Sequence, residues 1–268
     1  MLKYKLIAAD LDGTLLDGQG LISDRTRKAV EEYHRRGGVF TLATGRMENS
    51  ALEYVRELNV RAPIIAFNGG KIVSFEDGAV LSEAALDVDK AMRAYQVLRE
   101  LKKDFVIYRG AEPYTAEITG VIEKYSKRIK ADINIIEDPT DVINTSTMKI
   151  LVIDPKMEYD LLLSAMKAIF GDTLNCVCSD PEFFEILPEN VSKGRGLEII
   201  AESLGIPMEQ VIAIGDHLND ISMLKVAGLG VAVRNAEEEV LAAADYITSS
   251  NDEDGVAEVI EKVIENEL

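Results

Sequence analysis

Short apolar runs alternate with amphipathic segments along the first third of the chain. The runs at residues 6–9, 39–44 and 64–67 are bounded by Gly, Asp or Asn, which is typical of short buried strands. Between them, the pattern predicts one helix that is capped by Ser23 and stops at Gly37 and Gly38, and a second helix over about 48–58. Strands separated by helices predict parallel βαβ units.

The same alternation returns after Lys193. It predicts helices over 194–204, over 220–227 and from about 255, with strands over 211–214 and 229–233. The two ends of the chain therefore predict one α/β core, a doubly wound parallel sheet of the Rossmann-like kind.

A stretch of about one hundred residues between these blocks has a different pattern. A hairpin of residues 71–74 and 79–82 leads into it. Further in, we expect helices over 88–102 and 156–170, and strands over 105–108, over 149–153, near Cys176 and near Phe184. Mixed helices and antiparallel strands predict a separate α+β cap domain over 83–188, inserted into a core domain made of 1–82 plus 189–268.

Composition restricts the class of protein. The chain has 268 residues with 47% hydrophobic content, enough to fill a core, and a formal net charge of −18. That charge disfavours nucleic acid or an anionic membrane as a partner. An apolar run long enough to span a bilayer is missing from the sequence, and Asp10 and Asp12 come too early for a secretory signal, so we expect a cytoplasmic protein. The sequence does not indicate the oligomeric state.

The cysteines and histidines narrow the chemistry. Cys176 and Cys178 lie on one face of a predicted strand without a zinc-binding spacing, so we interpret them as structural free thiols. His34 lies in a charged helical run and is expected at the surface. His217 is then the one histidine left as a candidate for catalysis.

The segment that carries most chemistry is Asp10-Leu11-Asp12-Gly13-Thr14, directly after the first strand. Open α/β sheets bind ligands at the carboxyl ends of their strands, where Asp10 and Asp12 are placed. Gly13 permits a sharp turn, and Thr14 can fix it with its hydroxyl. The pair offers one carboxylate for metal binding or nucleophilic attack and a second for proton transfer. An ordinary Asp-rich turn is the alternative, whereas a calcium-binding EF-hand loop does not fit because a strand leads into the segment.

Three more sites fall at the same edge of the predicted sheet. Thr44 and Gly45 end the second strand and offer a hydroxyl and a backbone amide to phosphate oxygens. Lys193 starts a helix, where its ammonium group can reach a phosphate. Asp216, Asn219 and Asp220 follow a later strand and form an oxygen-rich set suited to Mg²⁺. Each of these signals is weak alone, since each is also ordinary in a loop, a cap or a surface.

Taken in order, the four motifs closely resemble those of the haloacid dehalogenase superfamily of phosphohydrolases. The similar segments are Asp10-Leu11-Asp12-Gly13-Thr14, then Thr44-Gly45-Arg46, then Lys193, then Gly215-Asp216 with Asn219-Asp220. The position of the insert, Asn68-Gly69-Gly70 and Phe183-Phe184-Glu185-Ile186 resemble the Cof-type branch with the larger α/β cap, type IIB.

This resemblance implies a Mg²⁺-dependent phosphatase of sugar phosphates or other small phosphorylated metabolites. It implies that Asp10 is the nucleophile that forms an aspartyl phosphate and that Asp12 is the general acid and base. Mg²⁺ would be held by Asp10, the backbone carbonyl of Asp12 and Asp216. The implied phosphate-binding groups are Leu11, Thr44, Gly45, Lys193 and Asn219, and the implied surrounding residues are Thr14, Arg46, His217 and Asp220.

Two other functions remain open at this stage. A phosphomutase or phosphotransferase would use the same intermediate with a hydroxyl group as acceptor, and a non-enzymatic sensor would only bind the phosphorylated metabolite. The substrate itself is not readable from the sequence. Candidate contacts to its leaving group in the cap are Tyr108, Arg109, Glu112 and Tyr114.

Overall fold

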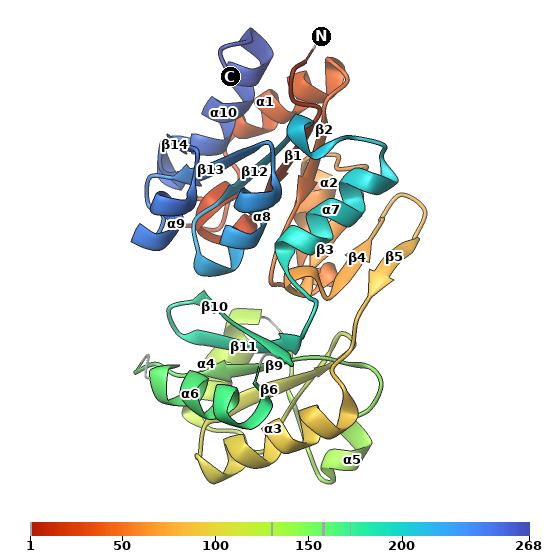
Figure 1. Cartoon of the computed structure of the whole chain (residues 1–268), viewed down its shortest axis with the longest axis vertical. Helices are drawn as coiled ribbons and strands as arrows, with labels where there is room; N and C mark the ends of the chain where they lie inside the picture. Colours follow the sequence, from red (N-terminus) through yellow and green to blue (C-terminus); the bar gives the residue numbers. More distant parts are fainter. Residues whose placement is uncertain (1, 130, 157–158, 172) are drawn as a thin grey trace. The chain divides into compact units, whose positions relative to one another are not determined.

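The computed structural model describes residues 2–129, 131–156, 159–171 and 173–268 and divides into two compact units (Figure 1). Met1–Glu83 and Ser192–Leu268 form the first, which we call the core unit. Ala84–Val191 form the second, the inserted unit. The sequence places these divisions after residues 82 and 188, slightly earlier in both cases. The first division comes later because a strand continues to Glu83.

The core unit contains a five-stranded parallel sheet in the order β14-β13-β12-β1-β2. Its strands are β1 (Leu6–Ala9), β2 (Val39–Leu42), β12 (Val211–Gly215), β13 (Leu229–Val233) and β14 (Tyr246–Thr248). β1 pairs with β2 on one side and with β12 on the other, so the chain continues outward in opposite directions from β1. Such a switch point in strand order is where open α/β sheets form their ligand crevice.

Helices cover both faces of this sheet (Figure 1). They are α1 (Asp24–Arg35), α2 (Glu48–Glu57), α7 (Lys193–Ser203), α8 (Ile221–Val226), α9 (Glu238–Ala243) and α10 (Gly255–Glu265). Side chains alternate along each strand. Ile7 and Ala9 pack with α1, α2 and α10, whereas Leu6 and Ala8 pack with α7, α8 and α9. All four residues are fully buried, as expected for a parallel sheet between two helical layers.

A separate three-stranded antiparallel sheet follows α2. It contains β3 (Ile64–Ala66), β4 (Lys71–Val73) and β5 (Val80–Glu83). The hairpin of β4 and β5 is the one the sequence predicts. The run over 64–67 does not extend the main sheet; a single parallel bridge from Ala43 to Ile65 links the two sheets.

The inserted unit is an α+β structure with a six-stranded sheet in the order β10-β11-β9-β6-β7-β8. Its strands are β6 (Asp104–Arg109), β7 (Glu112–Thr115), β8 (Asn134–Ile135), β9 (Thr147–Ile153), β10 (Leu174–Asp180) and β11 (Phe183–Pro188). Its helices are α3 (Val88–Glu100), α4 (Gly120–Ile129), α5 (Pro139–Val142) and α6 (Tyr159–Phe170). Strand pairing is antiparallel except between β7 and β8. Apolar side chains of α3 and α6 pack on one face of the sheet.

Several elements depart from the predicted pattern. The sequence pattern predicts no helix or strand between 110 and 148, where the structure has β7, α4, β8 and α5, and it predicts neither α9 nor β14. Five of these elements, β7, β8, α5, α9 and β14, span two to six residues, so their periodicity is weak. The exception is α4, which spans ten residues, as many as the predicted α2, and was missed. The helix predicted from residue 156 begins at Tyr159, and residues 157–158 lie outside the described part of the chain.

The two cysteines lie on β10 without a disulfide bond and pack against the apolar cluster of the inserted unit. Burial raises the pKa of the Cys176 thiol to about 11, which makes it unreactive near neutral pH, as a structural thiol should be. His34 departs from the expectation of a solvated surface residue, because it is half-buried. Burial lowers the pKa of its imidazole, and the positive charge of Arg61 lowers it further. In the described part of the chain, no helix is both long enough and apolar enough to cross a membrane.

Each unit has its own apolar core, and this leads to a prediction. Two hydrophobic clusters consist of residues of the core unit, and a third consists of residues of the inserted unit. Residues 1–83 joined to 192–268 by a short Gly/Ser linker should therefore fold alone. Thermal melting followed by circular dichroism should show one cooperative transition. A broad transition without a cooperative step would mean that the core unit depends on the insert.

Candidate active site

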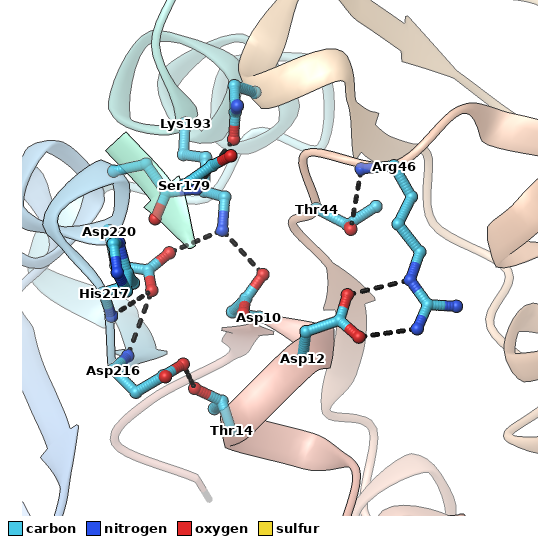
Figure 2. A network of polar contacts seen from close by, with 12 residues as sticks. Asp10, Asp12, Thr14, Thr44, Arg46, Ser179, Lys193, Asp216, His217 and Asp220 are labelled. Carbon is cyan, nitrogen blue, oxygen red and sulfur yellow. Dashed lines mark hydrogen bonds and ion pairs between the residues drawn. The ribbon is translucent and has the colours of Figure 1, made fainter. Parts of the chain in front are cut away.

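The site is formed at the carboxyl ends of β1 and β12, the neighbouring strands at the switch point (Figure 2). Asp10 directly follows β1, and its backbone amide donates to the carbonyl of Ile214 at 3.0 Å. Asp216 directly follows β12. Pairing of the two strands therefore fixes both carboxylates at one edge of the sheet. The Asp10 residue is 6% exposed, so its carboxylate lies in a largely dry environment.

A tight turn after Asp10 brings the first motif against the fourth. Gly13 has φ of +79°, and a Cβ atom there would lie 2.4 Å from Oδ2 of Asp216. Only glycine meets both conditions without strain. The next residue, Thr14, donates its hydroxyl to Oδ1 of Asp216 at 2.6 Å. The turn thus orients the Asp216 carboxylate.

Lys193 is the first residue of α7 and its side chain is fully buried. Its Nζ atom lies 2.6 Å from Oδ1 of Asp10 and 2.6 Å from Oδ1 of Asp220 (Figure 2). Burial alone would lower the pKa of this ammonium group, but the two carboxylates raise it above its usual value. Lys193 therefore stays charged and fixes the Asp10 carboxylate.

Asp220 positions several parts of this site, whereas the family resemblance implied only that it lies near the site. Its second oxygen, Oδ2, accepts the backbone N–H groups of Asp216 and His217, both at 3.0 Å. One fully buried carboxylate thus positions the loop after β12 and the Lys193 ammonium group together. His217 lies with Nε2 2.8 Å from a carboxylate oxygen of Glu237.

The carboxylates form a group that fits a divalent cation. Oxygens of Asp10, Asp216 and Asp220 lie within 4.8 Å of one another. Burial raises the pKa of Asp10; Lys193 opposes this rise, and the neighbouring carboxylates add to it. Burial and then Asp220 raise the pKa of Asp216 to about 7. Three acidic groups face a single lysine, and an all-oxygen donor set is the kind that Mg²⁺ prefers, so these residues fit that ion.

Arg46 of the second motif binds Asp12, the second carboxylate of the first motif. Arg46 directs Nε to Oδ2 of Asp12 at 2.8 Å and Nη2 to Oδ1 at 2.5 Å (Figure 2). Its guanidinium group also lies over the ring of Tyr54, 5.5 Å from the ring centre. Burial would lower the pKa of Arg46, but Asp12 raises it beyond its usual value. The side chain of Asp12 is 50% exposed, so the pair lies toward solvent.

Thr44 and Asn219 have protein partners in this structure. The Thr44 hydroxyl accepts the backbone N–H of Arg46 at 3.0 Å. The Asn219 amide donates to Oδ1 of Asn68 at 2.9 Å. In the sequence, Asn68 is notable only as part of Asn68-Gly69-Gly70, which resembles a motif of the Cof-type branch. Its contact with Asn219 was not foreseen, because it joins side chains far apart in the chain.

The core unit therefore brings together most of the residues singled out from the sequence. At its sheet edge lie Asp10, Leu11, Asp12, Thr14, Thr44, Gly45, Arg46, Lys193, Asp216, His217, Asn219 and Asp220. The four candidate substrate contacts belong to the inserted unit. There, Arg109 contacts Glu112 and Tyr114, and the Tyr108 hydroxyl lies 2.6 Å from that of Tyr125.

Comparisons with known proteins agree with this geometry. Residues 7–260 match the family model of haloacid dehalogenase-like hydrolases. YxeH of Bacillus subtilis is 33% identical over 97% of this chain and 98% of its own length. The 5-amino-6-(5-phospho-D-ribitylamino)uracil phosphatase YcsE of B. subtilis is 32% identical over 96% and 94%. The structure of the subclass IIB sugar phosphatase BT4131 superposes with a TM-score of 0.83 at 25% identity, covering 96% of this chain and 98% of the other.

The chain belongs to the haloacid dehalogenase-like hydrolases. This membership confirms the resemblance seen in the sequence, the α/β core fold with an added α+β unit, and the assignment to enzymes of the phosphatase kind. Enzymes of this family generally use a divalent metal ion, in agreement with the carboxylate group around Asp10.

Proposed function

We propose that this protein is a Mg²⁺-dependent phosphatase that hydrolyses small phosphorylated metabolites through an aspartyl phosphate on Asp10. The observation that carries the proposal is the placement of Asp10, buried at the end of β1, between Lys193 and Asp216. A nucleophilic carboxylate needs this combination of fixed orientation and nearby positive charge.

Charge decides whether a phosphate can approach Asp10. Each pair of like charges at 4 Å costs roughly 4 kcal/mol at an effective dielectric constant near 20. Lys193 offsets part of this repulsion, since its ammonium group is 2.6 Å from Asp10. Asp10, Asp216 and the backbone carbonyl of Asp12 would hold Mg²⁺, which would supply further positive charge against this repulsion.

Asp10 acts as the nucleophile. One of its carboxylate oxygens forms a bond to phosphorus while the bond from phosphorus to the leaving oxygen breaks, in line with it. Lys193 holds the carboxylate in one orientation. Phosphoryl oxygens are bound by the backbone amides of Leu11 and Gly45 and by Thr44, with Asn219 as a further ligand. Water then attacks the aspartyl phosphate and releases inorganic phosphate.

Asp12 transfers the protons. As a general acid it protonates the leaving alkoxide, and as a general base it later takes a proton from the attacking water. Both of its oxygens face Arg46 in this structure. To donate a proton, the Asp12 carboxyl group therefore has to turn away from Arg46. We assign to Arg46 the role of binding the Asp12 carboxylate between the two proton transfers.

The substrate class is proposed from the role of the inserted unit and from the similar proteins. We assign it the role of a cap that excludes bulk water and reads the leaving group. The similar proteins YcsE and BT4131 are named as phosphatases of a ribitylamino-uracil phosphate and of sugars, so a phosphorylated polyol or sugar is the class to test first. The formal net charge of −18 disfavours nucleic acid and anionic membranes as partners, as part of the same proposal.

Phosphate release in the presence and absence of metal tests this function. We expect p-nitrophenyl phosphate and sugar phosphates to give equal amounts of alcohol and inorganic phosphate with Mg²⁺. Excess EDTA should abolish turnover and added Mg²⁺ should restore it, because the site offers oxygen ligands only. Asp10→Asn, of nearly the same shape, is the inactive control. Full activity in EDTA would reject the metal, and alcohol release without phosphate would show transfer to another acceptor.

The role of Asp12 predicts a dependence on the leaving group. Asp12→Asn should lower the rate of leaving-group release from a sugar phosphate by about 10²- to 10⁴-fold, the usual contribution of general acid catalysis. With acetyl phosphate the loss should be smaller, because its leaving group needs little protonation. Rapid-quench single turnovers measure both rates, and exposed Asp89→Asn serves as the control. Equal losses with both substrates would assign Asp12 to the metal or to the fold.

A further inference from the structure

An unusual turn follows β3 beside the site. Phe67, Asn68 and Gly69 have φ values of +51°, +56° and +101°, three consecutive residues in the left-handed region. A bulky residue such as phenylalanine is a clear outlier there, and a non-glycine residue in this region carries backbone strain. Strain of this kind persists where the surroundings enforce it, and it is concentrated at functional sites.

Hydrogen bonds to the second motif and a close approach to Ser192 fix the position of this turn. The backbone amide of Phe67 donates to the Arg46 carbonyl and that of Asn68 to the Thr44 carbonyl, both at 3.0 Å. On the other side, a Cβ atom on Gly69 would lie 2.2 Å from the carbonyl oxygen of Ser192, so only glycine fits. The turn is thus fixed between the loop after β2 and the residue that precedes Lys193.

The side chain of Asn68 reaches the fourth motif. Its Oδ1 accepts the Asn219 amide at 2.9 Å. Among the described residues, neither Nδ2 of Asn68 nor Oδ1 of Asn219 has a hydrogen-bond partner. Yet Asn68 is 1% exposed and Asn219 is 8% exposed. Reversing both amides exchanges their roles but again leaves one NH₂ group and one carbonyl unpaired.

An unpaired buried amide is costly. Leaving such a polar group without a partner is unfavourable, so an unpaired one in a native protein points to a ligand, an ion or a water that completes the bond. The Asn68 amide also lies in the right place for one. A Cβ atom on Gly45 would be 3.1 Å from both Nδ2 and Oδ1 of Asn68, so the side-chain amide group lies against the residue whose backbone is proposed to bind phosphate oxygens.

We propose that Asn68 is a further phosphate-binding residue: its amide NH₂ donates to an oxygen of the transferring phosphoryl group while its carbonyl orients Asn219. This inference rests on the proposed phosphatase function and adds a ligand to the same site. A neutral donor suits the position, since it binds a phosphoryl oxygen without neutralising the Asp10 nucleophile as a second lysine would. The left-handed backbone at residues 67–69 aims the amide at that oxygen before substrate arrives.

Three variants separate binding by Asn68 from mere support of Asn219. Asn68→Gly deletes the amide and accepts the positive φ, Asn219→Ala removes the partner, and the double variant combines them. Calorimetric titration with inorganic phosphate and Mg²⁺ measures binding, and turnover of p-nitrophenyl phosphate measures kcat/KM. We expect Asn68→Gly to weaken phosphate binding about tenfold and to lower kcat/KM about 10²-fold, as for loss of one donor to a transition-state oxyanion.

The double variant decides the proposal. It should bind phosphate about tenfold more weakly than Asn219→Ala, because without the Asn219 amide there is nothing left for Asn68 to orient, and any further loss reports a direct contact of Asn68 with phosphate. Equal binding by the double variant and Asn219→Ala would overturn the proposal and leave Asn68 only a positioning role. Unchanged binding by Asn68→Gly would overturn it as well.

Control variants distinguish loss of phosphate binding from loss of folding. Asn59 has φ of +49° at an exposed position, so Asn59→Gly matches the backbone change and should leave binding and kcat/KM unchanged. Asn68→Asp retains the acceptor for Asn219 and the left-handed backbone, and is the replacement if Asn68→Gly does not melt cooperatively; wild-type phosphate binding by it would overturn the proposal. If the wild-type protein releases no phosphate from any ester, the phosphatase proposal fails, and the binding titration still judges Asn68.

Discussion

The buried ammonium group of Lys193 is the interaction on which the rest of the site depends. It binds Asp10 and Asp220 at once, at 2.6 Å each, and it lies 183 residues from Asp10 in the sequence. Breaking a buried ion pair by removing one partner typically costs about 3–5 kcal/mol. Lys193 therefore joins the two separate sequence segments of the core unit at the point where chemistry is proposed. Asp220 transmits the same constraint to the loop that carries Asp216.

The site nevertheless carries more negative than positive charge. Asp10, Asp216 and Asp220 face one lysine, and the pKa of Asp216 rises to about 7 through burial and Asp220. Such a group is unfavourable alone and becomes favourable with a bound cation and a phosphate held by surrounding donors. The switch point in the sheet supplies the geometry, since β1 and β12 deliver their carboxylates side by side. The inserted unit, to which we assign leaving-group recognition as part of the proposal, has its own core and sheet.

Sequence reasoning succeeded where a signal is local and strong. β1, β2 and β12 are apolar runs that stop at Asp, Thr or Gly, and Ser23 caps α1 as expected. It failed where elements are short or half exposed. β8 has two exposed residues, and α5 spans only Pro139–Val142, so neither has a readable period.

Side-chain partners were the least predictable part of the site. The types of residue at Asp10, Lys193 and Asp216 indicated phosphate and metal chemistry, because their order along the chain matches the family motifs. The pairing of Asp12 with Arg46 and that of Asn68 with Asn219 depend on rotamers and on the packing of distant segments. The strained turn at Phe67 has no sequence signal either, since phenylalanine is not a residue that predicts positive φ.

Trapping the covalent intermediate tests the central claim most directly. Acid quench of the wild-type protein within one turnover of ³²P-labelled acetyl phosphate and Mg²⁺, followed by peptide mapping, locates any label on the chain. The account predicts a hydroxylamine-sensitive label on the peptide that contains Asp10, and no label in Asp10→Asn. Label on a different residue, or a burst of acetate without labelled protein, would contradict the assignment of Asp10 as the nucleophile.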